Sequence, residues 1–150
     1  MQMAQYELAG VSGSALSTLK LRSAAKICFE EFLITKELPK RDLLLECQIS
    51  ITLIQEFGTY LILHAHKQVG DMKQIMSGTA LNYLSQTILF FRIKFKNLKF
   101  LEKDENWQYL LRSDIEKRID NRQMHNGEPV SEKSRAIGRK LLKVHLVFIN

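Results

Sequence analysis

The sequence of 150 residues has few of the residues that interrupt or cross-link a fold: two prolines, seven glycines and two cysteines. So little proline and glycine excludes a low-complexity or collagen-like chain. Two cysteines are too few for a small scaffold built on disulfides, and we expect Cys28 and Cys47 to be buried free thiols. The longest uninterrupted apolar runs have about five residues, whereas a membrane-spanning helix needs about 18.

The first residues also lack the cationic segment and the apolar segment of a secretory signal. We expect residues 1–13, which contain Gly and Ser, to form a flexible lead-in. The absence of a signal and of a membrane span predicts an intracellular location in a reducing compartment, with no membrane as a partner.

The positive charge is unevenly distributed along the chain. Residues 1–91 contain 8 Lys and Arg against 8 Asp and Glu, whereas residues 92–150 contain 14 against 8. The whole formal net charge of +6 therefore lies in the second of these segments. A basic segment beside a balanced one indicates a polyanionic partner.

Apolar residues recur at the spacing of amphipathic helices through most of the chain. Ser77 and Ser131 are expected to cap two of these helices. We expect helices over 14–36, 47–67, 77–95, from about 107 to the sequence HNG at 125–127, and 131–143. The sequence therefore predicts an all-α fold, a single small bundle of four to five helices over residues 14–143, followed by an apolar tail at 144–150.

The helix expected over 77–95 has two different faces. One face is apolar and must pack inward; it carries Leu81, Leu84, Ile88, Phe91 and Phe95. The first half of the opposite face carries polar side chains that can form hydrogen bonds, and we expect it to point outward; these residues are Thr79, Asn82, Tyr83 and Gln86.

Positively charged residues follow in three groups. Each is either a solvated surface or a set of phosphate contacts, because a cation that neutralises a phosphate releases a counterion and strengthens binding. Arg122 has no acidic residue four positions before it, whereas Arg118 can pair with Asp114. The candidate phosphate contacts are Arg92, Lys94, Lys96 and Lys99 in the first group, Arg122 in the second, and Arg135, Arg139 and Lys143, at i, i+4 and i+8, in the third.

The chain contains no recognisable catalytic or cofactor motif. There is no Gly-rich phosphate loop, no GxSxG sequence and no HExxH sequence. His64 and His66 are two residues apart and would point away from each other on a helix, so they cannot easily share a metal ion. We therefore expect no cofactor, no metal and no small-molecule substrate.

Three segments together resemble a known family: SGTALNYLSQTILFFRIKF, NWQYLLRSDIEKRI and GEPVSEKSRAIGRKLL. They resemble the N-terminal core-binding (SAM-like) domain of tyrosine recombinases, which are phage-integrase-like proteins, most closely the crypton-type mobile elements. The likeness runs from about Leu16 to Leu142. It implies a helical bundle that forms half of a clamp around duplex DNA, in which Thr79, Asn82, Tyr83 and Gln86 would face the major groove.

The chain departs from this family in one respect. In the family a second domain supplies the nucleophilic tyrosine and its Arg, Lys and His companions, whereas this chain stops soon after Arg139. None of its four tyrosines stands in such a constellation. The resemblance thus implies a DNA-binding half without the cutting half, either a fragment or a remnant of a mobile-element integrase, and not an enzyme.

These observations lead to two hypotheses. The first is a non-catalytic, nuclear DNA-binding domain of recombinase type that grips double-stranded DNA and can self-associate on it. The second is a helical protein-interaction module that docks an acidic partner. Under the first hypothesis the cations hold phosphates, while Asn82, Tyr83 and Gln86 approach base edges.

Overall fold

The computed structural model describes residues 13–65 and 74–125, which form a bundle of four α-helices with three short 3-10 helices. Neither described range contains a β-strand, so the predicted all-α fold is confirmed. The elements are α2 (Gly13–Thr35), η1 (Arg41–Leu43), η2 (Glu46–Gln48), α3 (Ile51–Leu63), α4 (Ser77–Lys94), η3 (Lys99–Leu101) and α5 (Asn106–His125). The lead-in expected before the first helix, the helix expected over 131–143 and the apolar tail at 144–150 lie outside the described residues.

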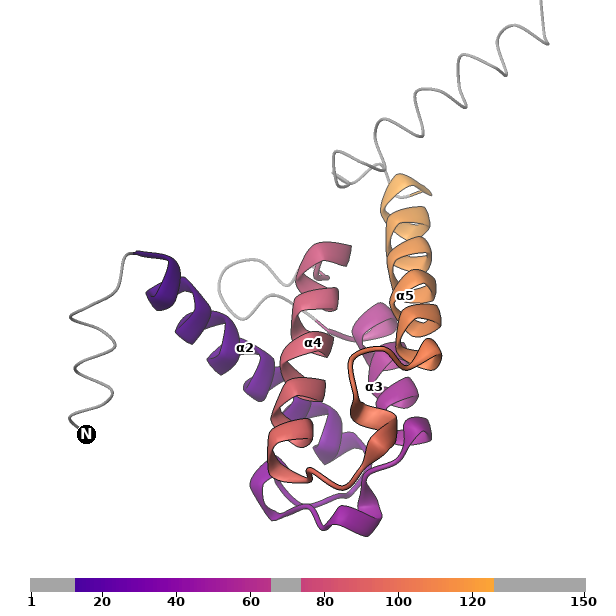
Figure 1. Cartoon of the computed structure of the whole chain (residues 1–150). Helices are drawn as coiled ribbons and strands as arrows, with labels where there is room; N and C mark the ends of the chain where they lie inside the picture. Colours follow the sequence, from indigo (N-terminus) through magenta and orange to yellow (C-terminus); the bar gives the residue numbers. More distant parts are fainter. Residues whose placement is uncertain (1–12, 66–73, 126–150) are drawn as a thin grey trace, which may run out of the picture.

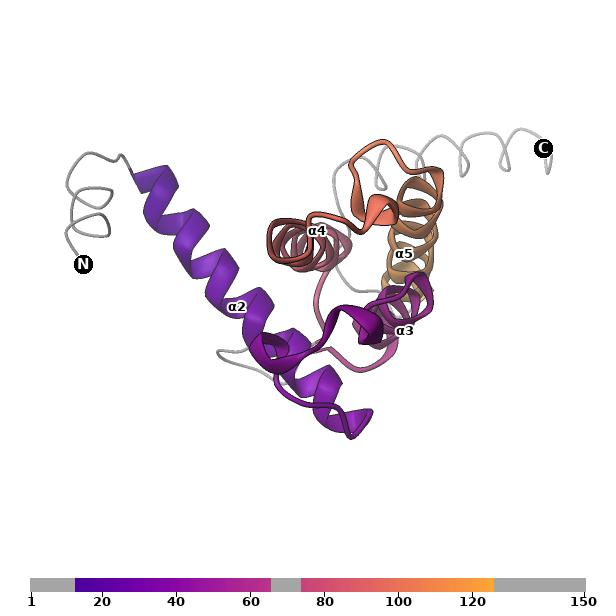
Figure 2. The same ribbon diagram turned by 60° about the horizontal axis from the view of Figure 1, so that its bottom comes forward.

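Helix α4 lies at the centre of the bundle. Helix α2 packs along one side of it and α5 along the other, while α3 packs against both α4 and α5 (Figures 1 and 2). The N-terminal turns of α2 extend beyond the other helices (Figure 1). This arrangement leaves one long side of α4 open between its two neighbours.

Aromatic rings join three of the helices at the centre of the core. Phe29 of α2 lies edge-on to Phe57 of α3, with ring centroids 4.8 Å apart, and to Phe91 of α4, at 5.5 Å. All three side chains are fully buried. Edge-to-face pairs of this kind each contribute about 0.5–1.5 kcal/mol beyond the burial of their area. The expectation that Phe91 belongs to the core is confirmed, and Leu81 and Phe95 are partly buried against it.

The helix expected over 47–67 is shorter than the periodicity suggested. Ser50 has an extended backbone, and its Oγ accepts a hydrogen bond of 3.0 Å from the backbone N–H of Leu53, so α3 begins at Ile51. Cys47 precedes this cap, in η2, and is exposed. The expected burial of Cys47 is therefore wrong, while Cys28 on α2 is buried as expected.

One expectation for a helix start also needs correction. Ser77 is not the N-cap of α4 but its first residue, after Met76, and its hydroxyl donates instead to a residue of α5. On α5 the inward face carries Ile115 and Ile119, which are fully buried, whereas Leu110 is 59% exposed.

Candidate functional site

Two hollows lie on either side of the open face of α4, and basic residues line both. The hollow toward α5 has a volume of about 460 Å³, and its cations are Arg92, Lys103 and Arg112. The hollow toward α2 has a volume of about 230 Å³, and its cations are Arg22 and Arg41. Among the residues that the structure describes, no acidic side chain lines either hollow. We call the two hollows, with the strip of α4 between them, the α4 surface.

The strip of α4 between the hollows carries no charge. Gln86 and Leu89 line both hollows, which places them on the ridge that separates the two. Asn82 and Ile93 lie on the same stripe of the helix, one turn before and one turn after, and both are exposed. The ridge is thus polar in its first half and apolar in its second, with cations along each side.

Arg112 of α5 is the most unusual of these cations. It is only partly exposed, and burial lowers the pKa of its guanidinium below the usual value. Within the described part of the chain it forms no hydrogen bond and no ion pair. A partly desolvated charge without a counter-charge is costly, and an anion bound beside it would lower that cost. Such a group marks a candidate binding site.

Hydrogen bonds fix the loop that precedes α5 and carries Lys103. The indole N–H of Trp107 donates to the carbonyl oxygen of Phe100 at 2.8 Å. The side-chain amide of Gln108 donates to the same oxygen at 3.1 Å and to that of Glu102 at 2.8 Å. Gln108 is buried and lies one turn before Arg112. The first turn of α5 therefore holds the loop in place next to the arginine.

On the other side of α4, an aromatic ring orients Arg41. The guanidinium carbon lies 3.7 Å from the centroid of the Phe90 ring, a stacking contact with a cation–π component. Burial lowers the pKa of Arg41, while the carboxylates of Asp42 and Glu30 act in the opposite direction. Arg41 is thus partly neutralised by acids, in contrast to Arg112.

The four α4 residues that were predicted to face the major groove differ in their exposure. Gln86 lines both hollows, and Asn82 is exposed on the ridge. Thr79 is partly buried near the start of the helix. Tyr83 is only 6% exposed, so the expectation that it points outward is wrong. Burial and nearby groups on α2 raise the pKa of Tyr83, which places its hydroxyl on the side of α4 that α2 covers.

The four cations predicted as phosphate contacts around the end of α4 also lie in different surroundings. Arg92 lines the hollow toward α5. Lys94 donates a hydrogen bond to the backbone oxygen of Asp42 and lies 5.3 Å from the Phe95 ring, so it helps to fix the end of α4 against η1. Lys96 and Lys99 are exposed but line neither hollow. This first group of candidate phosphate contacts therefore does not line one common hollow.

The side chain of Arg122 is partly buried and bonds to the backbone of two other segments. Its guanidinium donates to the backbone oxygen of Ile62 at the end of α3 and, at 3.2 Å, to that of Ile75 just before α4. These bonds give Arg122 a structural role, and its role as a phosphate contact stays a prediction. The pair of Asp114 and Arg118 is confirmed, with 3.5 Å between Oδ2 and Nη1. Arg135, Arg139 and Lys143 lie outside the described residues.

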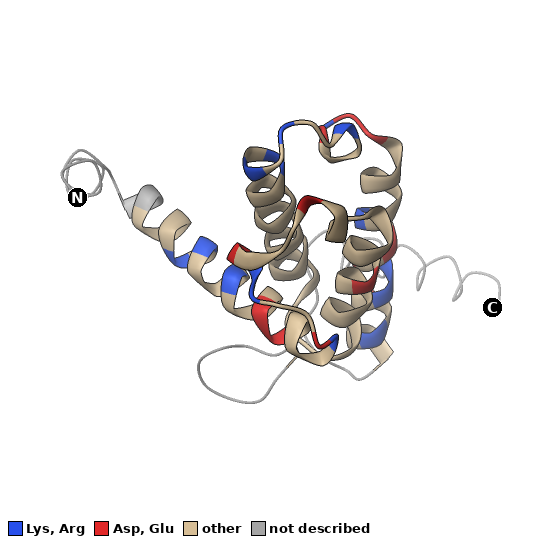
Figure 3. Cartoon of the chain, turned by 90° about the horizontal axis from the view of Figure 1, so that it is seen from below, with Lys and Arg blue, Asp and Glu red and all other residues tan. Residues whose placement is uncertain are grey.

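Sequence reasoning missed four of the five cations of the α4 surface. Arg112 had a usable signal, because it stands four residues after Gln108 on the same side of a helix and within a segment that carries the family resemblance. Arg22, Arg41 and Lys103 had none, because helix packing and a loop bring them to α4 from distant parts of the sequence. Figure 3 shows basic residues on α2, at the end of α4, in the following loop and on α5.

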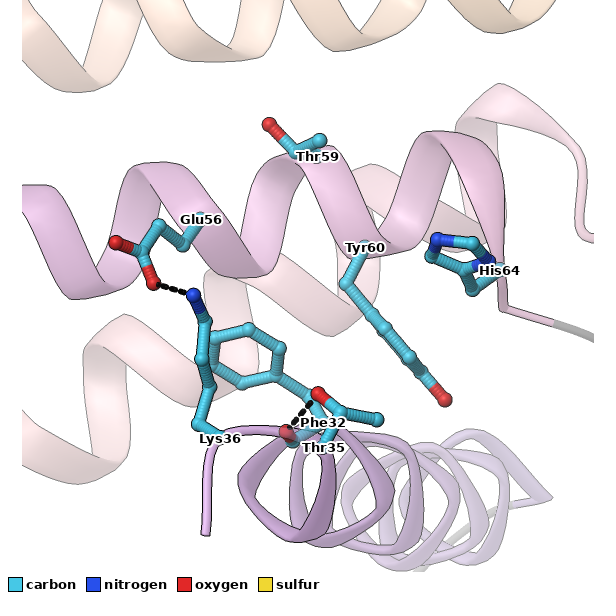
Figure 4. A pocket seen from close by; sticks show the side chains of 7 residues that line it. All are labelled: Phe32, Thr35, Lys36, Glu56, Thr59, Tyr60 and His64. Atoms are coloured by element: carbon cyan, nitrogen blue, oxygen red, sulfur yellow. Dashed lines mark hydrogen bonds and ion pairs between the residues drawn. The ribbon is translucent and has the colours of Figure 1, made fainter. Parts of the chain in front are cut away.

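A further hollow of about 570 Å³ lies between α2 and α3, and its lining has a different character (Figure 4). Lys36 and Glu56 form an ion pair at its edge, and Tyr60 extends from α3 toward α2. Burial, together with Cys28 and Glu31, raises the pKa of Tyr60 to about 12. The phenol therefore stays protonated at neutral pH. With its lysine already paired, this hollow offers hydrogen-bonding groups but is poorly suited to an anion.

The described residues contain no group of three or more His, Cys, Asp or Glu side chains that could hold a metal ion. None of the described helices is both long enough and apolar enough to cross a membrane.

Comparisons with protein-family models, with curated proteins and with solved structures gave no match for this chain. The resemblance to tyrosine recombinases therefore stays a prediction.

Proposed function

We propose that the chain is a non-catalytic, double-stranded DNA-binding domain of the tyrosine-recombinase core-binding type, and that it binds through the α4 surface. The observation that carries the proposal is the uncharged ridge of α4 with cations along both sides. The major groove of B-DNA admits an α-helix, and a phosphate backbone borders the groove on each side. A neutral helix face between two basic borders is complementary to that charge pattern.

The residues of the α4 surface divide naturally between the two tasks of DNA recognition. Arg92, Lys103 and Arg112 on one side would contact phosphates of one strand, and Arg22 and Arg41 on the other side those of the second strand. Such contacts position a protein without reading sequence. Asn82 and Gln86 on the ridge carry amides, which can pair with the N6 and N7 atoms of adenine. Leu89 and Ile93 can contact thymine methyl groups.

A location in the nucleus belongs to the same proposal, as the compartment of the DNA of a eukaryotic mobile element. The catalytic steps of recombination would require a separate domain that supplies the nucleophilic tyrosine.

A titration of the full chain with a fluorescent 20-base-pair duplex of random sequence tests the proposal. Fluorescence anisotropy is measured at several salt concentrations. If three to five phosphates are neutralised, we expect the slope of log K against log salt to lie between about −2.7 and −4.5. Affinity that is absent, or independent of salt, would contradict the proposal.

The second hypothesis, an acidic protein partner, is favoured by one observation. The apolar half of the ridge, with exposed Ile93 beside Leu89 and Phe90, could receive the apolar face of an acidic amphipathic helix. A competition experiment with an acidic amphipathic peptide and unlabelled duplex distinguishes the two hypotheses. A peptide partner would bind the α4 surface in the presence of excess duplex, whereas a DNA-binding surface would release the peptide.

A further inference from the structure

Helix α2 carries apolar side chains on two opposite sides. Phe29, Phe32 and Leu33 face the core, while Ile27 is 44% and Ile34 74% exposed on the outer side. Leu16 and Leu19 are also exposed, on the turns that extend beyond the bundle. At about 100° per residue, Leu16, Ile27 and Ile34 fall within about 20° of one line, with Leu19 about 60° to one side. We call these four residues the outer stripe of α2.

The outer stripe continues into a hollow at the end of the helix. This hollow, of about 350 Å³, is lined by apolar and charged side chains. Its apolar part is formed by Ile27, Leu33, Ile34 and Leu38. A stripe of large apolar residues along a whole helix, ending in an apolar hollow, is more typical of an interface than of a solvated surface.

The charges beside the outer stripe change sign along the helix. Lys20 and Lys26 flank its first half, while Glu30 and Glu31 flank its second half. Lys20 and Glu31 lie on one edge of the stripe, and Lys26 and Glu30 on the other, by the same angular spacing. Each edge therefore has a cation near the N-terminal end and an acid near the C-terminal end. A second helix with the same sequence in the opposite direction would meet opposite charges along both edges.

We propose that the outer stripe is the interface for a second copy of this chain, with the two α2 helices antiparallel and the two-fold axis at Ile27. A symmetric contact of this kind pairs residue i with about residue 54 − i. Ile27 then meets Ile27, and Leu19 meets Ile34 within one residue. Leu16 of one copy reaches Leu38 and the apolar hollow of the other. A two-fold interface is the commonest form of a protein dimer.

The same arrangement brings the flanking charges together. Lys20 of one copy lies within a turn of Glu31 of the other, and Lys26 within a turn of Glu30. A parallel arrangement would instead place each edge of the stripe against the other edge of the second copy, with Glu31 beside Glu30 and with Lys20 and Lys26 on the same side of the contact. Flanking charges of this kind set the orientation of paired helices. Lys26 also contacts Asp42 at 3.3 Å in its own chain, but both side chains are exposed, so this ion pair contributes little.

Sedimentation velocity of the full chain without DNA, over a wide range of protein concentration, tests the interface. We expect a reversible dimer. Ile34→Glu changes a largely exposed residue and should raise the dissociation constant tenfold or more, because a charge would be buried against Leu19 of the second copy. Ile27→Glu should do the same at the two-fold axis. Leu110→Glu changes a leucine on α5 whose exposure, 59%, lies between those of Ile27 and Ile34, and it should leave the dimer unchanged.

A charge exchange tests the antiparallel orientation. Lys20→Glu should weaken the dimer, and the double variant Lys20→Glu with Glu31→Lys should restore it, because the two charges only change places. Circular dichroism of each variant verifies that the helices remain folded. A wild-type monomer at all concentrations, a dimer insensitive to both isoleucine variants, or a double variant weaker than Lys20→Glu would overturn the proposal. Because no DNA is present, none of these outcomes depends on the function proposed for the α4 surface.

Discussion

The hydroxyl of Ser77, the first residue of α4, donates a hydrogen bond of 2.7 Å to the Oδ1 atom of Asp120 on α5. The two residues are 43 positions apart in the sequence, and both are buried. The bond fixes the start of α4 against the last turns of α5. It therefore helps to set the relative position of the two helices that border the larger hollow of the α4 surface.

Loss of this bond should destabilise the protein. Ser77→Ala leaves a buried carboxylate without one of its donors, which costs about 1–3 kcal/mol in the free energy of unfolding. Urea denaturation followed by circular dichroism measures the change. Ser85→Ala is the matched control, since its hydroxyl donates only to the backbone oxygen of Leu81 within α4; we expect a change within about 0.5 kcal/mol. Equal effects of the two changes would contradict the assignment.

Gly58 of α3 is required by the close approach of α5. A Cβ atom at this position would lie 2.9 Å from Cδ1 of Leu111 and 3.1 Å from Cδ1 of Ile115. Gly58→Val should therefore lower the free energy of unfolding by about 1–3 kcal/mol through overpacking. Adding Leu111→Ala makes room, so the double variant should be more stable than the sum of the two single changes predicts. Gly78→Val should not destabilise, because no described residue lies within 4 Å of its Cβ position.

The two cysteines should differ sharply in reactivity. Cys28 is buried, and burial, with the carboxylate of Glu31, raises the pKa of its thiol to about 12. Since the thiolate is the reactive form, Cys28 should not react in the folded protein at neutral pH. Cys47 is exposed and should react first. Mass spectrometry after brief treatment with iodoacetamide measures this, and Cys47→Ser should leave a protein that is labelled only when it unfolds.

The protein should lose stability in alkaline solution. The thiol of Cys28 has a pKa raised to about 12 in the folded state, from 9.0. Between these two values the unfolded chain loses the proton while the folded chain keeps it, so the free energy of unfolding falls as pH rises. The raised pKa of Tyr60 acts in the same direction above pH 10. Cys28→Ala should reduce the slope between pH 9 and 11 by up to about one proton. An unchanged slope would contradict the assignment to Cys28.

Removing one charge from the α4 surface should weaken DNA binding more than removing one elsewhere. Arg112→Gln should reduce affinity for all duplex sequences and lower the magnitude of the salt slope by about one unit. Arg118→Gln removes the same charge from another side of α5, where the arginine already pairs with Asp114. If the two variants bind equally, net charge alone explains the binding and the α4 surface is not the site.

The helices could be predicted from the sequence because local spacing determines them. Four of the expected segments are helical in the described residues, and the inward positions of Leu84, Ile88 and Phe91 follow from the period of 3.6. The start of α3 could not be placed from apolar periodicity, because the single cap at Ser50 decides it. The local spacing of apolar residues thus predicted which segments are helical, but it did not predict where each helix begins and ends.

The candidate site was less predictable because contacts between segments determine it. Tyr83 and Gln86 both appeared on the polar side of α4, and only the position of α2 decides that one is buried and the other lines the hollows. Arg122 lacked an acid at helical spacing, but backbone oxygens of Ile62 and Ile75 accept its hydrogen bonds. Those oxygens lie 60 and 47 residues away along the chain and leave no trace in the spacing of charged residues.

The uncompensated guanidinium of Arg112 also affects the protein when nothing is bound. An isolated, partly buried charge lowers the stability of the fold that holds it, and an anion that settles beside it removes part of this penalty. Sulfate or phosphate ions should thus raise the melting temperature of the wild-type chain more than that of a chain with glutamine at this position. The melting temperature would then report whether an anion, even a small inorganic one, is bound at the α4 surface.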